Sequence, residues 1–264
     1  MTQYHSKPVD EAGIVDWSKE EDRIWHDLVV RQLDKVNDKA CQAYLDGLDT
    51  LNLSIDRVPQ LPEINAVLQR ETGWSVEPVP ALINFDRFFD LLANKKFPVA
   101  TFLRSREEFD YLQEPDFFHE VFGHCAMLTH PDFASFTHKY GQLGQKASSK
   151  ERAYLARLYW FTVEFGLVKE KGQTKIYGGG ILSSPGETIY ALGNPEQLHQ
   201  PFNVENVLRT PYRIDIMQPT YFELGDIKEL YQLSQMDLMA QVHNAMELGL
   251  FTPLFERKEV THAG

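Results

Sequence analysis

The chain has 264 residues, a formal net charge of −12 at pH 7 and a hydrophobic share of 43%. This length allows one sizeable core, and the negative charge argues against nucleic acid or an anionic membrane as the main partner. The two cysteines, Cys41 and Cys125, argue against a disulfide framework, and the sequence shows neither a secretory signal nor a membrane-spanning apolar run. We therefore expect a cytoplasmic protein.

Apolar spacing and the positions of proline and glycine predict a mainly helical chain with a few short strands. At the first helix, Ser18 and Glu21 have the spacing of a capping box. In chain order we expect a loose tail (residues 1–15), one or two helices (18–50), a short helix (62–73), an extended or irregular segment (74–83), an aromatic-rich helical turn (85–92) and a strand (99–103).

The second half of the chain begins with a predicted helix that starts near Pro115 and is interrupted at Gly123. After it we expect a helix from Pro131, a mobile loop (141–150), a helix (151–168), a strand entering a glycine bend (175–182), a strand within 208–222 and a final amphipathic helix (228–248). No internal repeat or linker divides the chain. We expect a single α+β domain, predominantly helical, over residues 16–264.

Two histidines, His119 and His124, lie five positions apart in the stretch E-P-D-F-F-H-E-V-F-G-H. Imidazole is the commonest metal ligand among side chains. Zinc peptidases use H-E-x-x-H, in which both rings share one helix face, whereas this motif is one residue longer. Five residues turn an α-helix by about 500°, which leaves the two rings roughly 140° apart. Both can bind one metal only if the helix opens near Gly123, by a wide π-type turn or by ending there.

Glu164 is a candidate third ligand, because it lies in the apolar stretch W-F-T-V-E-F-G-L. A buried carboxylate needs a partner. The residues alone leave three interpretations open: a salt bridge with Arg157, metal ligation, or exposure at the helix edge. Two histidines and a carboxylate form the set that holds non-haem iron(II), and the same set serves catalytic zinc.

Four blocks carry a family resemblance. They are E-P-D-x-x-H-E-x-x-G-H, L-Y-W-F-T-V-E-F-G-L (158–167), Y-G-G-G-I-L-S-S-P-G-E (177–187) and Q-P-T-Y-F (218–222). In this order they resemble the pterin-dependent aromatic amino acid hydroxylases, most of all the short bacterial phenylalanine 4-monooxygenases, over most of residues 60–225. The animal enzymes of this family have an N-terminal regulatory domain and a long C-terminal tetramerisation helix. At 264 residues we expect this chain to have neither.

The resemblance also implies roles for single residues. It makes His119, His124 and Glu164 the ligands of Fe(II). Substrate contacts are implied for Arg104 at the carboxylate, Ser183 assisting it, Gly180 where the backbone passes close, and Trp160 and Phe165 as aromatic walls. Pterin contacts are implied for Phe88 (with Phe89 as the alternative), Glu120 and Tyr159, the last two also near the iron-bound oxygen. Asp116 is expected to accept a hydrogen bond from a ligand imidazole.

The implied reaction is hydroxylation of L-phenylalanine to L-tyrosine with O₂, Fe(II) and a tetrahydropterin, either tetrahydrobiopterin or a bacterial analogue. Trp160 suggests phenylalanine over tryptophan, since the tryptophan enzymes resemble one another in having phenylalanine there. We expect a monomer, with a dimer as the alternative. A zinc hydrolase with Glu120 as general base is the second hypothesis, and a non-catalytic metal- or amino-acid-binding protein is the third.

Overall fold

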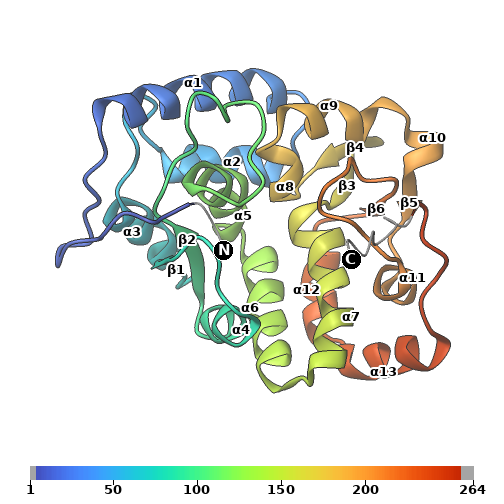
Figure 1. Ribbon diagram of the computed structural model, residues 1–264. Helices are drawn as coiled ribbons and strands as arrows, with labels where there is room; N and C mark the ends of the chain where they lie inside the picture. Colours follow the sequence, from blue (N-terminus) through green and yellow to red (C-terminus); the bar gives the residue numbers. More distant parts are fainter. Residues whose placement is uncertain (1–3, 257–264) are drawn as a thin grey trace, which may run out of the picture.

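Helices dominate the computed structural model, which describes residues 4–256 (Figure 1). The expected fold class, α+β and predominantly helical, is confirmed. The α-helices are α1 (Lys19–Val36), α2 (Gln42–Leu51), α3 (Leu61–Glu71), α4 (Phe85–Ala93), α5 (Ala126–Leu128), α6 (Pro131–Lys146), α7 (Ser149–Tyr159), α8 (Gly179–Leu182), α9 (Pro185–Gly193), α10 (Pro195–Leu198), α11 (Val204–Arg209), α12 (Glu229–Gln235) and α13 (Leu238–Leu248). Two π-helices are η1 (His119–Cys125) and η2 (Trp160–Glu164). The strands are β1 (Ser75–Val79), β2 (Lys96–Ala100), β3 (Leu167–Glu170), β4 (Gln173–Ile176), β5 (His199–Pro201) and β6 (Tyr221–Leu224).

The first helix begins as its sequence predicts. Ser18 accepts a hydrogen bond from the backbone of Glu21, and the Glu21 side chain bonds back to the backbone of Ser18, so the capping box is confirmed. Helix α1 turns its buried face, which includes Trp25 and Leu28, toward the core. In Figure 1 it runs along the top of the molecule.

Strands β1 and β2 are parallel and are joined by α4. Parallel neighbours need such a crossover, because a tight turn can only join antiparallel strands. The strand predicted at 99–103 begins earlier, at Lys96, because Ser75 to Val79 pair with Lys96 to Ala100. Pro98 is tolerated since each strand of a two-stranded sheet has a free edge.

A second sheet has the strand order β4-β3-β6-β5. Strand β3 is antiparallel to β4, whereas β6 is parallel to both β3 and β5. The strand predicted to enter a glycine bend ends at Ile176, and the glycines that follow form the short helix α8 instead of an open bend. Helix α8 packs against η1, which places it beside the histidine pair.

The mobile loop predicted for residues 141–150 is wrong. Residues up to Lys146 belong to α6, and α7 begins at Ser149. Gly141 and Gly144 face α4 so closely that a Cβ on Gly144 would lie 2.0 Å from the ring of Phe89. The glycines therefore permit close contact between two helices and do not mark a loop.

Two predicted helices have different limits in the structure. The helix predicted for 151–168 changes to π geometry at Trp160, and the chain enters β3 at Leu167. The final helix is divided into α12 and α13, because the side chain of Asp237 accepts a hydrogen bond from the backbone of Ala240 and caps a new helix.

The N-terminal segment lies against the domain from Tyr4 onward. Lys7 donates its backbone N–H to the carbonyl of Thr101 at 2.8 Å, and the Thr101 hydroxyl donates to the carbonyl of Lys7 at 2.8 Å. Cys41 and Cys125 are buried free thiols, as expected. Within residues 4–256, no helix is both long enough and apolar enough to cross a bilayer.

Candidate metal centre

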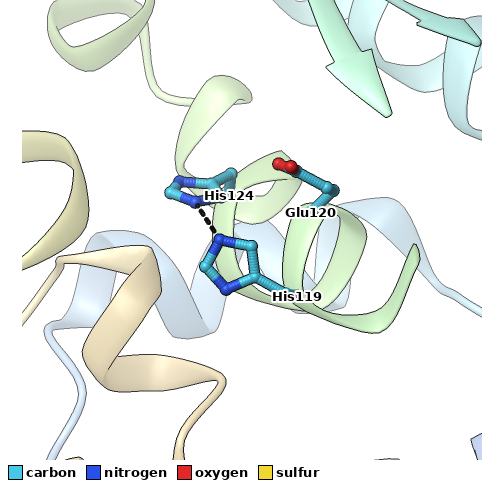
Figure 2. Close-up of side chains that lie close together, drawn as sticks. All are labelled: His119, Glu120 and His124. Atoms are coloured by element: carbon cyan, nitrogen blue, oxygen red, sulfur yellow. Dashed lines mark hydrogen bonds between the residues drawn. The ribbon is translucent and has the colours of Figure 1, made fainter. Parts of the chain in front are cut away.

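The two histidines predicted to share a metal lie together in the π-helix η1 (Figure 2). Their Nε2 atoms are 3.2 Å apart, and their rings meet at 79°. A regular α-helix would place the rings on different faces. The wide i→i+5 turns of a π-helix return His124 toward His119. The prediction that this helix opens near Gly123 is confirmed, and it opens by π geometry without ending.

Glu164 faces the same point from η2. Its carboxylate oxygens lie 3.3 Å from Nε2 of His124 and 3.7 Å from Nε2 of His119. The salt bridge considered with Arg157 is absent from the described residues, since that guanidinium donates to the carbonyl of Ala153. Burial acts to raise the pKa of Glu164, but the neighbouring imidazoles outweigh it and the pKa lies below its usual value.

Ser183, at the end of α8, determines which nitrogen of His119 carries the proton. The Ser183 hydroxyl donates to the carbonyl of Gly179 at 2.8 Å, so its oxygen accepts from Nδ1–H of His119, also at 2.8 Å. The lone pair of His119 then lies on Nε2, which faces His124 and Glu164. Burial lowers the pKa of His119 to about 4, which keeps the ring neutral near pH 7.

These residues fit a divalent cation. Two ring nitrogens and a carboxylate converge, with neighbouring separations of 3.2 to 3.7 Å. Nδ1 of His124 is buried with no hydrogen-bond partner among the described residues, and this ring packs directly on Gly179. Two imidazoles and one carboxylate match the donor set of non-haem iron, with coordination positions left open.

Glu120 is a second carboxyl group at this centre. Its oxygen lies within 4.8 Å of the ligand nitrogens of His119 and His124. Burial, together with the charges of Glu164 and Asp116, raises its pKa well above the usual value. A carboxyl group that holds its proton is a poor metal ligand. The two imidazoles lower the pKa of Glu164, which favours the ionised form that a metal requires, so Glu164 is the better third ligand.

Arg104 and Asp116 form a buried ion pair beside η1. The guanidinium contacts both carboxylate oxygens, with Nε 2.8 Å from Oδ2 and Nη2 2.9 Å from Oδ1. Asp116 also accepts from the backbone N–H of His119 at 3.0 Å. The expectation that Asp116 accepts from a ligand imidazole is wrong, because this carboxylate is occupied by the backbone and by Arg104. Three of the five N–H donors of the guanidinium remain for another anion.

Aromatic rings line the side of the centre next to Glu164. The rings of Trp160 and Phe165 are tilted by 33° with centroids 4.5 Å apart, and Tyr212 stacks on Trp160 at the same centroid distance. A Cβ on Gly180 would lie 3.1 Å from both the Phe165 ring and Oε2 of Glu164. The predicted residues Trp160, Phe165 and Gly180 are thus together. Tyr212 was not predicted, because nothing in its local sequence distinguishes it.

Phe88 and Phe89 differ in environment. Phe89 is fully buried against Gly144, whereas Phe88 is half-buried and meets Tyr159 edge-on at 5.3 Å. Burial and the charges of Glu164 and Glu120 raise the pKa of Tyr159 well above its usual value. Of the two phenylalanines, Phe88 is the one whose ring contacts Tyr159.

Comparison with known proteins gives a consistent result. Residues 2–247 match the family model described as biopterin-dependent aromatic amino acid hydroxylase. The chain is 72% identical to phenylalanine-4-hydroxylase of Vibrio cholerae over all of its own length and 91% of that protein. A phenylalanine hydroxylase structure from Colwellia psychrerythraea has a TM-score of 0.92 at 54% identity, covering 95% of this chain and 97% of that one. A Chromobacterium violaceum phenylalanine hydroxylase with bound oxidised Fe(III) has a TM-score of 0.86 at 38% identity, covering 92% and 91%.

Proposed function

This chain belongs to the biopterin-dependent aromatic amino acid hydroxylases, and from that premise we propose how its own residues carry out the reaction. It is an enzyme that hydroxylates L-phenylalanine to L-tyrosine with O₂ and a tetrahydropterin at a non-haem iron centre. The alternative of a zinc-dependent hydrolase has no support from its relatives.

The proposed iron ligands are His119, His124 and Glu164. Their convergence across two π-helices is the observation that carries the proposal, with the two Nε2 atoms 3.2 Å apart. When bound, the iron and the pterin supply the oxidising chemistry, so the chain provides orientation and a site that excludes water. Ser183 holds the ring of His119 in the tautomer that presents Nε2.

The substrate is proposed to lie between Arg104 and the aromatic wall. The free donors of the Arg104 guanidinium suit the carboxylate of an amino acid, and Asp116 holds that guanidinium in place. Trp160 and Phe165 then flank the phenyl ring, and Gly180 leaves room for it next to Glu164. A side chain at position 180 would fill this space.

The pterin is proposed to stack on Phe88, the half-buried ring beside Tyr159. Burial and the charges of Glu164 and Asp116 raise the pKa of Glu120, which favours the protonated form that can donate a hydrogen bond to the cofactor. Tyr159 also keeps its proton and donates from the opposite helix. Glu120 and Tyr159 would thus hold protons at defined places beside the proposed metal ligands.

We propose in addition that the protein is a cytoplasmic monomer with one catalytic domain, to be checked by sedimentation against the chain mass of 30.5 kDa. The net charge of −12 offers no attraction to nucleic acid or to anionic membranes. Trp160 supports a preference for phenylalanine over tryptophan as substrate.

The test compares Glu164→Ala with the wild type and with Glu196→Ala, which removes an exposed glutamate of α10. Each protein is loaded anaerobically with Fe(II), its bound iron is measured, and tyrosine formation is followed with tetrahydropterin and phenylalanine. We expect Glu164→Ala to lose iron and activity together, while Glu196→Ala keeps both. Equal tyrosine formation by Glu164→Ala and the wild type would remove Glu164 from the site.

A further inference from the structure

Trp160, the proposed wall of the substrate pocket, is held by two neighbouring rings and one hydrogen bond. Phe165 and Tyr212 each lie 4.5 Å from it, centroid to centroid. Its indole Nε1–H donates to Oε1 of Gln218 at 2.9 Å. These two ring contacts limit the tilt of the indole. The directional hydrogen bond to Gln218 adds a restraint on rotation of the Trp160 side chain about χ1 and χ2.

Gln218 is buried and can be oriented in one way only. Its Nε2 donates to the carbonyl oxygens of Arg213 at 2.9 Å and Ile216 at 3.0 Å. Since a carbonyl can only accept, the amide nitrogen must lie on that side and Oε1 must face the indole. All three hydrogen bonds of the side chain are thus satisfied together, within a segment that contributes no metal ligand.

The backbone of Gln218 is also anchored. Its N–H donates to Oε1 of Glu187 at 3.2 Å, and the hydroxyl of Tyr221 donates to the same oxygen. Glu187 is a buried residue of α9, the helix that follows Ser183. Gln218, which accepts from the indole, is therefore anchored to α9, and the residue that orients His119, Ser183, lies just before that helix.

Phe165 and Gly180 lie between the indole and the proposed metal ligand Glu164. The ring centroids of Trp160 and Phe165 are 4.5 Å apart, and a Cβ on Gly180 would lie 3.1 Å from both the Phe165 ring and Oε2 of Glu164. A shift of the indole would therefore press on a ring that lies beside the same glycine as the Glu164 carboxylate. Interiors are close-packed, so such a displacement is transmitted to neighbouring rings.

We propose that Gln218 is a positioning residue that, through Trp160, determines how the substrate ring is aligned with the metal. The inference rests on the proposed function. Removing the side-chain amide leaves the indole N–H without its acceptor, and we expect kcat/KM for phenylalanine to fall about tenfold. Tetrahydropterin oxidation should fall less than tyrosine formation, because Gln218 contacts neither the metal ligands nor the residues assigned to the pterin.

The kinetic test uses Gln218→Met, which keeps the length of the side chain, and Gln69→Met as the control at an exposed position of α3. Both are made in the wild type and in Trp160→Phe. If Gln218 acts through the indole, Gln218→Met should have little further effect on kcat/KM once Trp160 is phenylalanine. Equal losses in both backgrounds would overturn the proposal, as would an unchanged ratio of tyrosine formed to pterin oxidised.

A spectroscopic test does not depend on activity. The chain has four tryptophans, and the ¹⁵N–¹H indole signal of Trp160 is identified by its loss in Trp160→Phe. We expect slow solvent exchange of this proton in the wild type and in the Gln69→Met control, and faster exchange in Gln218→Met. Exchange in the wild type at the rate of an exposed indole would overturn the proposal without any variant. If the wild type formed no tyrosine, the proposed function would fail, and this signal would still decide the contact.

Discussion

At the scale of single residues, the neighbours of each polar group determine its role at this centre. Glu164 and Glu120 are both partly buried carboxyl groups near the same two histidines, yet the pKa of Glu164 is lowered and that of Glu120 is raised. The difference arises because Glu164 faces the imidazoles directly, whereas Glu120 has only carboxylates among its charged neighbours. The sequence offers both acids and does not show which will be ionised.

The sequence predicted local geometry best where the spacing of two residues constrained the backbone between them. His119 and His124 predicted an opened helix because two ligands five positions apart must meet at one atom. No comparable constraint existed for Ser183, whose contact with Nδ1 of His119 comes from a segment 64 positions away. Nor did any local pattern indicate Gln218 or Tyr212. Their roles depend on tertiary contacts that the chain makes only when folded.

Glu187 makes the stability of this protein depend on pH. Burial raises the pKa of Glu187, outweighing the hydrogen bonds that it accepts from Tyr221 and Gln218. Above its unfolded-state pKa, near 4.5, the folded state binds more protons at this group than the unfolded state does. Its contribution to the free energy of unfolding therefore falls as pH rises through the folded pKa.

The substitution Glu187→Gln removes this dependence, because an amide oxygen can still accept from Tyr221 and from the backbone of Gln218. Urea unfolding of the metal-free protein at several pH values should show the variant gaining stability relative to the wild type as pH rises from about 4.5. Glu196→Gln, at an exposed position, serves as the control. A difference between Glu187→Gln and the wild type that stays constant with pH would contradict the assignment.

At the scale of elements, periodicity predicted the existence of most helices but not their ends. Residues 141–150 are polar and contain two glycines, a composition that is typical of a loop. The same glycines in fact form the face by which α6 approaches α4. The π-helix η2 was also missed. It carries one metal ligand, so there was no spacing between two ligands from which to infer it.

Gly144→Ala tests the contact between these two helices. Its Cβ would lie 2.0 Å from the fully buried ring of Phe89, so α4 and α6 must separate. We expect a loss of at least about 1–3 kcal/mol in the free energy of unfolding, measured by urea titration. Gly193→Ala is the matched control, since its Cβ would meet no atom within 4 Å, and we expect a change of at most about 0.5 kcal/mol. Equal effects at the two positions would mean that α6 does not depend on this close approach.

At the scale of the whole molecule, the proposed metal ligands connect segments that are distant in sequence. His119 and His124 belong to η1, and Glu164 belongs to η2, beyond both α6 and α7. A cation bound by all three stabilises only the folded chain, since the unfolded chain does not bring these ligands together. Bound iron should therefore raise the stability of the entire domain.

Anaerobic addition of Fe(II) at about 100 times its Kd should raise the free energy of unfolding by about 2.7 kcal/mol, seen as an increase in Tm. A chelator should reverse the increase, and Glu164→Ala should lose most of it. Mg²⁺ at the same concentration is the control, because that ion prefers oxygen ligands and should have little effect. A Tm that does not respond to Fe(II) would show that the three residues do not bind it in the folded state.

The two π-helices also determine which genetic changes this enzyme can tolerate. A π-helix uses i→i+5 hydrogen bonds, so it accommodates one residue more per turn than an α-helix does. In-frame loss of one codon between His119 and His124 would return η1 to α geometry and leave the two histidines four positions apart, a spacing at which both rings share one face of an α-helix. The π turn therefore absorbs one extra residue between the two histidines without separating their rings. Conversely, gain of a single codon can create such a segment from an ordinary helix.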